Sequence, residues 1–411
     1  MLNKIKQRII LIFKNIKMAI ISLTWKKDRR VVLFGSWFGE KFADNSRFLF
    51  QYMADNKEAL GLKSVGWVTR SETICNQLKQ MGYDAYLMGT KESVKFHKLA
   101  GYHIICDSSD DFAKVPTDIE TRYSWRAKRI NLWHGVVSFK GVGYGAGNYE
   151  KKKKAHPLIY GIKELLHKSS FFRKFIESSG GWGDCYFLST TPYKTDSMIT
   201  YFRLPRNHYI ESAVARLCGE VRLLPIEQKV MSMIKVHKHC ICYFPTFRGE
   251  GSSFDVYEAA ESIKDYLNKE DVLWIQKFHS ASSARTETLT VNGNIVTLPH
   301  DFDINTIIPK ASMVMTDYSS VTGDAIYYKK PLAFYVPDME EYNSTDRGFI
   351  IDPKEVMCGR VIKEKESLKA AVNAMLNEEF VPDEKYMEIF KRYFSDKRNI
   401  ECIWEDIKER V

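Results

Sequence analysis

Short apolar segments alternate with longer segments of helical periodicity along most of this 411-residue chain. The apolar segments are too short for buried helices and resemble strands that are buried on both faces. Strands that alternate with helices in this way build parallel sheets covered by crossover helices. The expected strands are Val31–Ser36, Ser64–Val68, Ala85–Met88, His103–Cys106, Arg129–Leu132, Cys240–Phe244, Val272–Lys277, Asn294–Thr297, Met313–Thr316 and Leu332–Tyr335.

The length of the chain predicts two domains, because it is too long for one ordinary hydrophobic core. We place the boundary near Gly219, after a stretch that contains proline and arginine, which gives domains at residues 31–218 and 219–411. Ligands of parallel sheets bind beyond the carboxyl ends of the strands. We therefore expect the chemically active residues at those ends.

The net charge of +10 is concentrated at the N-terminus. Residues 1–30 contain nine lysines and arginines and one aspartate, whereas the rest of the chain has 52 basic and 50 acidic residues. A nucleic-acid-binding domain carries its basic residues as a patch or stripe on the folded body. The nearly neutral body of this chain therefore argues against nucleic acid as a partner.

Residues 1–30 have the pattern of a basic amphipathic helix. Their apolar residues recur at steps of three and four: Leu2, Ile5, Ile9, Phe13, Ile16, Ile20 and Leu23. Lysines interrupt the segment, so no run is long enough to span a membrane, and no signal-peptide cleavage site follows. We expect this helix to lie in an anionic membrane surface. The alternative is a helix that packs on its own domain.

A second stretch combines basic and apolar residues. Lys151–Lys154 precede an apolar segment that extends to Phe175 and contains four more basic residues, and the stretch ends at Ser178–Gly181. This composition fits a second membrane-facing element, and a solvated surface is the alternative.

Eight cysteines are spread through the chain without a CxxC pair. In a chain of this size they indicate reduced thiols of a cytosolic protein. The ligand spacings of a structural zinc site are missing, so no structural metal is expected.

A histidine follows the expected strand Arg129–Leu132, in the sequence Trp133-His134-Gly135. A ring at the start of a loop can face a cleft, and imidazole exchanges protons near neutral pH. His134 is therefore a candidate general base, with a core histidine as the alternative.

Cationic residues follow two expected strands of the second half. The sequence Pro245-Thr246-Phe247-Arg248 presents a guanidinium group, whose planar shape matches a phosphate. Lys277 and His279 share one face of a strand end and could bind a diphosphate together. The alternative for each is a surface salt bridge or a capped strand end.

Polar residues also follow the strand Met313–Thr316. The sequence Asp317-Tyr318-Ser319-Ser320, with Asp324 after it, stands where a helix is expected to begin. Free N–H groups at a helix N-terminus favour a phosphate. Ser319 and Ser320 are therefore candidate phosphate ligands, and ordinary capping of the helix is the alternative.

Together these segments resemble the CDP-glycerol glycerophosphotransferase family, which builds teichoic acids and some capsules. The family's four motifs occur here in order as Trp133-His134-Gly135, Pro245–Arg248, Lys277-Phe278-His279, and Asp317–Ser320 followed by Asp324. The flanks agree at Asp303-Ile304-Asn305, Lys330-Pro331, Phe334-Tyr335, Glu341-Tyr342 and Arg347-Gly348-Phe349. The resemblance extends from about Phe34 to about Arg360.

The chain departs from the family's pattern at three places. Val136 stands where the family has threonine, and Ser280 stands where it has proline. The family's G-x-P-R-N-D stretch is reduced to residues 213–218, where only Arg216 is kept. The change at Val136 bears on the acceptor more than on the donor, because that loop would face the acceptor.

The resemblance implies a GT-B-like fold, in which two Rossmann-like domains with parallel sheets face a cleft, with the N-terminal amphipathic helix added. It implies that residues 31–218 bind the acceptor and that residues 219–411 bind CDP-glycerol. The enzyme would transfer glycerol phosphate to a hydroxyl of a lipid-linked teichoic acid or capsule precursor and release CMP. It would act as a peripheral protein on the cytoplasmic face of the bacterial cell membrane.

The resemblance also implies roles for individual residues. The expected catalytic residues are His134 and His279, and the expected supporting residues are Asp317, Asp324 and Arg347. The donor diphosphate is expected to contact Arg248, Lys277, His279, Ser319 and Ser320. No cofactor or metal is expected, because protein cations would neutralise the phosphates. The expected partners are CDP-glycerol, a lipid-linked saccharide or poly(glycerol phosphate) acceptor, and an anionic membrane surface.

Three other functions stay open. A GT-B glycosyltransferase would use a nucleotide sugar, and a related transferase would use CDP-ribitol or another CDP-polyol. A non-catalytic assembly factor is suggested by the altered stretch at residues 213–218, although the retained motifs argue against it. The motifs fit the addition of one unit as well as polymerisation.

Overall fold

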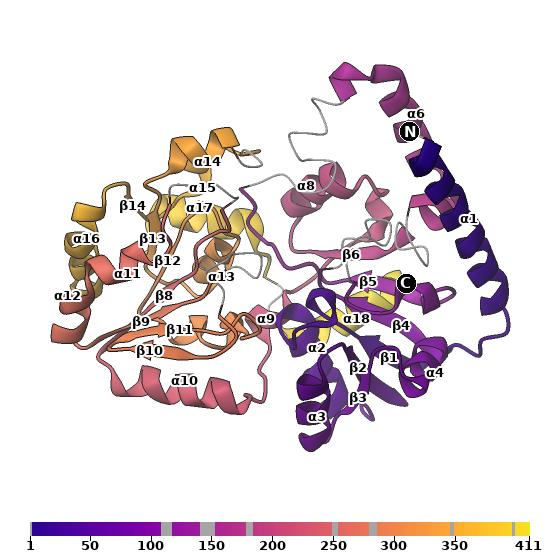
Figure 1. Cartoon of the computed structure of the whole chain (residues 1–411), viewed down its shortest axis with the longest axis horizontal. Coiled ribbons are helices and arrows are strands. Elements are labelled where there is room, and N and C mark those ends of the chain that lie inside the picture. The colour runs from indigo at the N-terminus through magenta and orange to yellow at the C-terminus, as the bar shows by residue number, and fades with distance from the viewer. Residues whose placement is uncertain are drawn as a thin grey trace.

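The computed structural model describes residues 2–107, 117–139, 153–177, 184–248, 254–278, 286–345, 349–396 and 399–411, without the side chains of residues 2–8, 11, 344 and 345. Two seven-stranded sheets, one in each half of the chain, organise these residues (Figure 1). Helices cover both faces of each sheet.

The first sheet is parallel throughout and has the strand order β3-β2-β1-β4-β5-β6-β7. Its strands are β1 (Asp28–Phe34), β2 (Ser64–Thr69), β3 (Asp84–Leu87), β4 (Ala100–Ile105), β5 (Lys128–Asn131), β6 (Tyr186–Ser189) and β7 (Tyr209–Glu211). Alternate side chains of β1 enter two different cores: Val32 and Phe34 one, Val31 and Leu33 the other. This period of two is what a strand buried on both faces requires.

The second sheet has the order β10-β11-β9-β8-β12-β13-β14 and is parallel except for the edge pair β10–β11. Its strands are β8 (His239–Tyr243), β9 (Val272–Gln276), β10 (Thr290–Asn292), β11 (Ile295–Thr297), β12 (Met313–Thr316), β13 (Leu332–Tyr335) and β14 (Arg360–Ile362). Two parallel sheets whose helices lie on both faces are the architecture that the alternating pattern predicted.

The helices of the first half are α1 (Leu2–Ser22), α2 (Asp44–Asp55), α3 (Glu72–Gln80), α4 (Lys91–Leu99), α6 (Pro157–Lys168), α7 (Ser170–Phe172), α8 (Pro192–Phe202) and α9 (Ala215–Cys218). Those of the second half are α10 (Pro225–Val236), α11 (Glu258–Ser262), α12 (Lys264–Lys269), α13 (Val321–Tyr327), α14 (Met339–Thr345), α15 (Pro353–Val356), α16 (Lys365–Asn377), α17 (Glu384–Tyr393) and α18 (Ile400–Arg410). A π-helical turn, η4 (Arg173–Glu177), follows α7.

Every strand expected from the sequence forms, and four further strands, β6, β7, β10 and β14, were missed. Three of these four are edge strands, and β6 lies next to an edge. All three residues of β10 and two of the three in β14 are exposed, so neither carries an apolar run. Edge strands need only one buried face, and their sequence signal is correspondingly weak.

The C-terminal helix α18 returns to the first domain. Its residues Ile400, Ile403, Trp404 and Ile407 lie in the core that contains Val32 and Phe34. Trp404 packs edge-on against Tyr102 of β4, with ring centres 5.0 Å apart. The expected second domain, residues 219–411, therefore includes a helix whose apolar stripe covers the first sheet (Figure 1).

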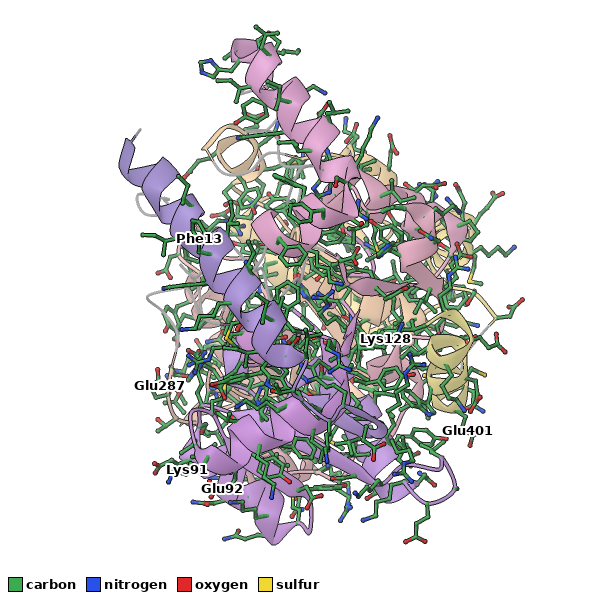
Figure 2. All side chains as sticks on the ribbon, turned by 90° about the vertical axis from the view of Figure 1, so that its right-hand side faces the viewer. Phe13, Lys91, Glu92, Lys128, Glu287 and Glu401 are labelled. Atoms are coloured by element: carbon green, nitrogen blue, oxygen red, sulfur yellow. The ribbon has the colours of Figure 1, made fainter. Side chains whose placement is uncertain are left out.

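Helix α1 lies along one side of the first domain and leaves apolar side chains exposed (Figure 1). Phe13 is 67% exposed and projects from this helix in Figure 2. Asn15 Nδ2 donates to the carbonyl of Phe175 at 3.1 Å, which joins α1 to η4. Within the part of the chain that the structure describes, no helix is long and apolar enough to cross a membrane.

The folded body begins earlier than the expected residue 31. Trp25 is buried, and β1 starts at Asp28. Lys27 Nζ donates to the carbonyls of His97 at 2.7 Å and Tyr123 at 3.2 Å. Residues 25–30 of the expected N-terminal segment are therefore part of the first domain.

Candidate active site

A cavity of 330 Å³ lies between the carboxyl ends of the two sheets. Five of the expected catalytic, diphosphate-binding and supporting residues line it: His134 from the first domain and Lys277, Ser319, Ser320 and Asp324 from the second. His134 and Lys277, which are more than 140 positions apart in the chain, thus line one cavity. Its position agrees with the rule that ligands bind beyond the carboxyl ends of parallel strands.

The loop after β5 presents His134 to this cavity. Trp133 has a left-handed backbone with φ of 54°, which is unfavourable for a residue other than glycine. Two asparagines hold it: the Trp133 nitrogen donates to Asn131 Oδ1 at 2.8 Å, and Asn45 Nδ2 donates to the Trp133 carbonyl at 2.6 Å. The sharp turn that follows points the next side chain away from the strand.

The ring of His134 is fixed on both sides. It packs against Trp37 and Trp133, with ring centres 5.0 Å and 4.5 Å away. Its Nδ1 lies 3.2 Å from the carbonyl oxygen of Cys106 and 3.5 Å from Asp107 Oδ1. Both neighbours are acceptors, so Nδ1 carries the hydrogen and Nε2 carries the lone pair of a neutral ring. This tautomer leaves Nε2 able to accept a proton.

Asp107 is a site residue that the sequence reasoning missed. It follows strand β4, in the same way that His134 follows β5, so the rule of polar residues at strand ends could have identified it. Burial raises the pKa of its carboxyl group, while the neighbouring His134 and Lys41 oppose that rise.

Asp317 joins the ends of β8 and β12. Its carboxylate accepts hydrogen bonds from the Thr246 nitrogen at 2.9 Å, from Thr246 Oγ1 at 2.6 Å and from the Tyr318 nitrogen at 2.5 Å. The side chain is completely buried. Asp317 therefore fixes the relative positions of the arginine loop and the serine loop.

Arg248 is held by the protein itself and does not line the cavity. Its guanidinium group donates to Asp317 at 2.8 Å, to the Thr246 carbonyl at 2.8 Å, and to Asp338 at 2.6 Å and 3.1 Å. The ring of Tyr342 lies 4.6 Å from its central carbon. We expected Arg248 to contact the donor diphosphate directly. In this geometry its guanidinium group is instead paired with the carboxylates of Asp317 and Asp338.

Lys277 reaches the cavity from the end of β9. Its Nζ donates to the carbonyl of Phe302 at 2.6 Å. Burial, followed by repulsion from Lys41, lowers the pKa of Lys277 to about 7, against the attraction of Asp303. His279 and Arg347, which the sequence also singled out, lie outside the described residues.

The serine loop lies close to the histidine loop. A side-chain carbon placed on Gly135 would lie 3.6 Å from Ser320 Cβ, so little space separates the two loops. Ser319 Oγ accepts from the Val321 nitrogen at 3.4 Å. Helix α13 begins at Val321 and has only seven residues. Because so short a helix has a weak dipole, we expect an anion at this loop to bind to the hydroxyl groups of Ser319 and Ser320.

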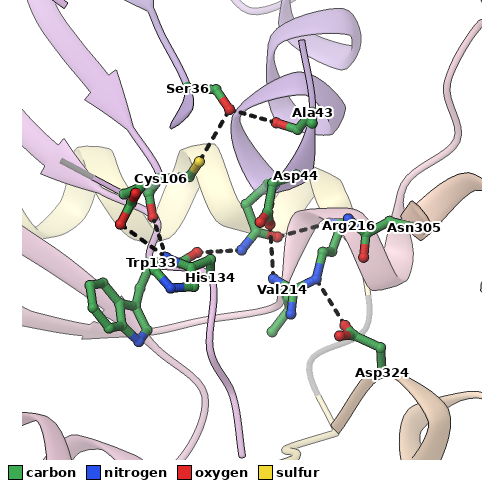
Figure 3. Close-up of polar contacts among 12 residues, drawn as sticks. Ser36, Ala43, Asp44, Cys106, Trp133, His134, Val214, Arg216, Asn305 and Asp324 are labelled. Carbon is green, nitrogen blue, oxygen red and sulfur yellow. Dashed lines mark hydrogen bonds and ion pairs between the residues drawn. The ribbon is translucent and has the colours of Figure 1, made fainter. Parts of the chain in front are cut away.

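A buried ion-pair network connects the two domains beside the cavity. Arg216 Nε donates to Asp324 Oδ1 at 2.8 Å, and Arg216 NH1 donates to Asp44 Oδ1 at 3.1 Å (Figure 3). Burial raises the pKa of Asp324 to about 6 although Arg216 opposes the rise. Arg216 is the residue kept from the family's altered stretch, and Asp44 was missed. Asp324 thus acts in the contact between domains.

Within the described residues, no three His, Cys, Asp or Glu side chains are grouped so that they could hold a metal ion. The charged groups that line the cavity are instead two lysines, one arginine and three carboxylates: Lys41, Lys277, Arg216, Asp44, Asp303 and Asp324.

Comparison with known proteins gives consistent matches. The model of the CDP-Glycerol:Poly(glycerophosphate) glycerophosphotransferase family matches residues 17–409. A teichoic acid poly(glycerol phosphate) polymerase of Bacillus spizizenii is 22% identical over 94% of this chain and 95% of its own length. A teichoic acid glycerol-phosphate transferase of Staphylococcus aureus is 23% identical over 83% of this chain and 82% of its own length.

Two further matches concern a shorter overlap and the fold. A teichoic acid ribitol-phosphate polymerase of Staphylococcus aureus is 24% identical over 69% of this chain, which spans 48% of that relative. The solved structure of the wall teichoic acid polymerase TagF superposes with a TM-score of 0.63 at 17% identity, and covers 100% of this chain and 99% of that chain. The structural match confirms the expected GT-B-like α/β fold.

The family model spans nearly the whole chain, and the described parts of the family's motifs lie at or beside the cavity. This chain therefore belongs to the CDP-glycerol:poly(glycerophosphate) glycerophosphotransferase family and is a transferase of glycerol phosphate.

Proposed function

We propose that the protein transfers glycerol phosphate from CDP-glycerol to a hydroxyl group of a lipid-linked teichoic acid or capsule precursor and releases CMP. The observation that carries this proposal is the cavity of 330 Å³ that His134 of the first domain lines together with Lys277, Ser319 and Ser320 of the second. A proton acceptor and anion-binding groups on opposite walls are what transfer of a phosphoryl group to a hydroxyl needs.

In the proposed reaction, His134 Nε2 accepts the proton of the acceptor hydroxyl as its oxygen attacks the β-phosphorus. The new oxygen–phosphorus bond forms while the bond from that phosphorus to the bridging oxygen breaks. CMP leaves with the bridging oxygen. The carbonyl of Cys106 accepts the Nδ1 hydrogen, and the carboxylate of Asp107 lies 3.5 Å from the same nitrogen, so both favour the required tautomer.

We assign the acceptor to the first domain and the donor to the second. Lys277, Ser319 and Ser320 then bind the donor diphosphate as they line the cavity from that side. Arg248 and Asp317 act indirectly, because they hold the loops that carry these residues. Phosphoryl transfer depends mainly on such positioning and on charge neutralisation.

His279 and Arg347 keep the roles that the sequence motif suggests: His279 as a catalytic and diphosphate-binding residue and Arg347 as a supporting residue. His279 stands two positions after Lys277, whose side chain lines the cavity. This proximity along the chain supports a place for His279 near the same ligand.

The decisive assay measures CMP release from CDP-glycerol by the purified protein with a lipid-linked acceptor. UDP-sugars, GDP-sugars and CDP-ribitol are tested in parallel, because one similar protein is named a ribitol-phosphate polymerase. We expect turnover of CDP-glycerol and none of the nucleotide sugars. Turnover of a nucleotide sugar alone would contradict the proposal, and preference for CDP-ribitol would change the polyol. The length of the product separates priming from polymerisation.

We further propose that the protein binds an anionic membrane surface, on the cytoplasmic face, through α1 and α6. Both helices expose apolar side chains: Ile9, Ile10, Phe13, Ile20 and Ile21 on α1, and Leu158, Ile159, Ile162, Leu165 and Leu166 on α6. Lysines accompany them, and each basic residue near an anionic surface contributes on the order of 1 kcal/mol. Such a position would bring a lipid-linked acceptor close to the cavity.

Vesicle sedimentation tests the membrane proposal. Removal of residues 1–22 should reduce binding to anionic vesicles and keep the fold, because the packed residues Trp25 and Lys27 remain. A full-length variant with Ile9→Ser, Phe13→Ser and Ile20→Ser keeps all charges and isolates the apolar contribution. Sedimentation of both variants equal to that of the unaltered chain would rule out α1 as an anchor.

A further inference from the structure

The loop between β1 and α2 enters the site with an unusual backbone. Trp37, Phe38 and Gly39 have φ angles of 42°, 61° and 77°, so three consecutive residues are left-handed. The Phe38 nitrogen donates to Asp118 Oδ1 at 2.7 Å, and Thr69 Oγ1 donates to the Gly39 carbonyl at 2.8 Å. Left-handed backbone persists only where its surroundings fix it, and such positions concentrate at binding sites.

This loop lies where an open parallel sheet binds its ligands. Strand β1 has β2 on one side and β4 on the other, and the order of the strands reverses between β1 and β4. A crevice opens beyond the carboxyl ends of two strands related in this way. The end of β1 leads into the Trp37 loop, and the end of β4 leads to Asp107, next to His134.

Lys41 is the cation that this loop brings to the cavity. Its side chain is 7% exposed, and it lines the 330 Å³ cavity from the first domain. Its Nζ lies 5.0 Å from the centre of the Trp37 ring, and that ring lies 5.0 Å from the ring of His134. Lys41 is therefore connected to the candidate base through one aromatic side chain.

Lys41 and Lys277 line the same cavity from opposite domains. Burial lowers the pKa of Lys41, and Asp301 is the first of several carboxylates that oppose this change. Lys41 in turn lowers the pKa of Lys277. Two ammonium groups that repel each other in one cavity favour an anion between them, because the anion relieves the repulsion.

We propose that Lys41 is a further catalytic residue, which contacts the phosphoryl group in transfer from the side opposite Lys277. The proposal rests on the proposed function, since it takes the β-phosphate of CDP-glycerol as the anion. An attacking hydroxyl beside His134 places the phosphorus between the two walls of the cavity. Charge in the transition state spreads over the non-bridging phosphate oxygens, and a cation on each side stabilises it.

Calorimetry and a CMP-release assay on the full chain test this proposal. Lys41→Gln should weaken the binding of CDP-glycerol about 10- to 100-fold, the range for one charged hydrogen bond. Binding of CMP, which lacks the β-phosphate, should stay within about twofold of wild type. CMP release should fall by about 10²–10³-fold, as for loss of one donor to a developing charge. The exposed Lys57→Gln is the matched control and should change none of these quantities.

Each alternative gives a different result. Equal weakening of CDP-glycerol and CMP binding, or a lowered melting temperature with normal binding per folded molecule, would reduce Lys41 to a structural role. Unchanged donor binding with a raised acceptor KM would move its contact to the acceptor and overturn the proposal. Lys41→Met, of similar length, replaces the glutamine variant if that one does not fold. A wild-type protein that does not bind CDP-glycerol would instead contradict the proposed function itself.

Discussion

Arg248 and Lys277 follow the carboxyl ends of two neighbouring strands, β8 and β9, yet their surroundings differ. Arg248 donates three hydrogen bonds to the carboxylates of Asp317 and Asp338 and stays outside the cavity. Lys277 donates to a main-chain carbonyl, lines the cavity and lies near a second cation. A cation that is hydrogen-bonded to carboxylates belongs to the framework, whereas one that is hydrogen-bonded to a neutral carbonyl, beside another cation, can still bind an anionic ligand.

The largest expected effect on CMP release comes from the candidate general base, His134. His134→Ala should lower CMP release by about 10²–10⁴-fold, because a general base is lost, and should leave the Kd for CDP-glycerol nearly unchanged. Rates and donor binding are measured on the same preparation, with the exposed His156→Ala as control. Near-normal turnover in a folded variant would remove His134 from the mechanism.

Arg248→Met tests whether this arginine is part of the framework. Two buried carboxylates would lose their partner, so the free energy of unfolding should fall by about 3–5 kcal/mol. Arg206 also pairs with two carboxylates, but at an exposed position, and Arg206→Met should cost at most about 1 kcal/mol. Denaturant titrations give both values. A fully stable Arg248→Met protein that fails to bind CDP-glycerol would show that Arg248 contacts the donor after all.

Lys277→Gln should affect donor binding and leave stability nearly unchanged, the opposite of what we expect for Arg248→Met. Glutamine can still donate to the Phe302 carbonyl, so the melting temperature should stay close to that of wild type. The Kd for CDP-glycerol should rise about 10- to 100-fold, because one charged hydrogen bond to the diphosphate is lost. If instead stability falls as much as in Arg248→Met while donor binding persists, the distinction between the two cations fails.

The pH dependence of donor binding gives the smallest effect. The pKa of Lys277 is lowered to about 7, so in the empty site its charged fraction falls as the pH rises through 7. A diphosphate favours the charged form, and donor affinity should therefore decline above pH 7, by at most about tenfold per pH unit. The same titration of Lys277→Gln should be flatter between pH 7 and 9. Parallel slopes for the two proteins would remove Lys277 from the donor site.

Much of the fold could be predicted because buried parallel strands leave a strong sequence signal. Val31–Phe34 and Met313–Met315 are continuous apolar runs, and both form strands in the interior of their sheets. The exposed strand β10 has no such run. The return of α18 to the first domain could not be predicted, because its apolar stripe fits either domain and only the folded chain decides between them.

The sequence predicted most residues of the candidate site, but it did not predict which of them pair with other residues of the protein. Polar residues at strand ends identified His134, Lys277, Ser319 and Ser320, which do line one cavity. Arg248 is kept out of the cavity partly by its pairing with Asp338, which lies 90 positions further along the chain and belongs to none of the motifs. Lys41 was missed because none of the family's motifs follows strand β1. The rule that polar residues after strand ends are site candidates could have identified it.

The position of α18 has a topological consequence. The polypeptide passes from the first domain to the second between α9 and α10, and it passes back between α17 and α18. The two crossings lie side by side, because a side-chain carbon placed on Gly219 would lie 2.5 Å from Ile400 Cδ1. The two domains are therefore joined covalently at one place, and the core of the first domain includes a helix that is reached only through the chain of the second.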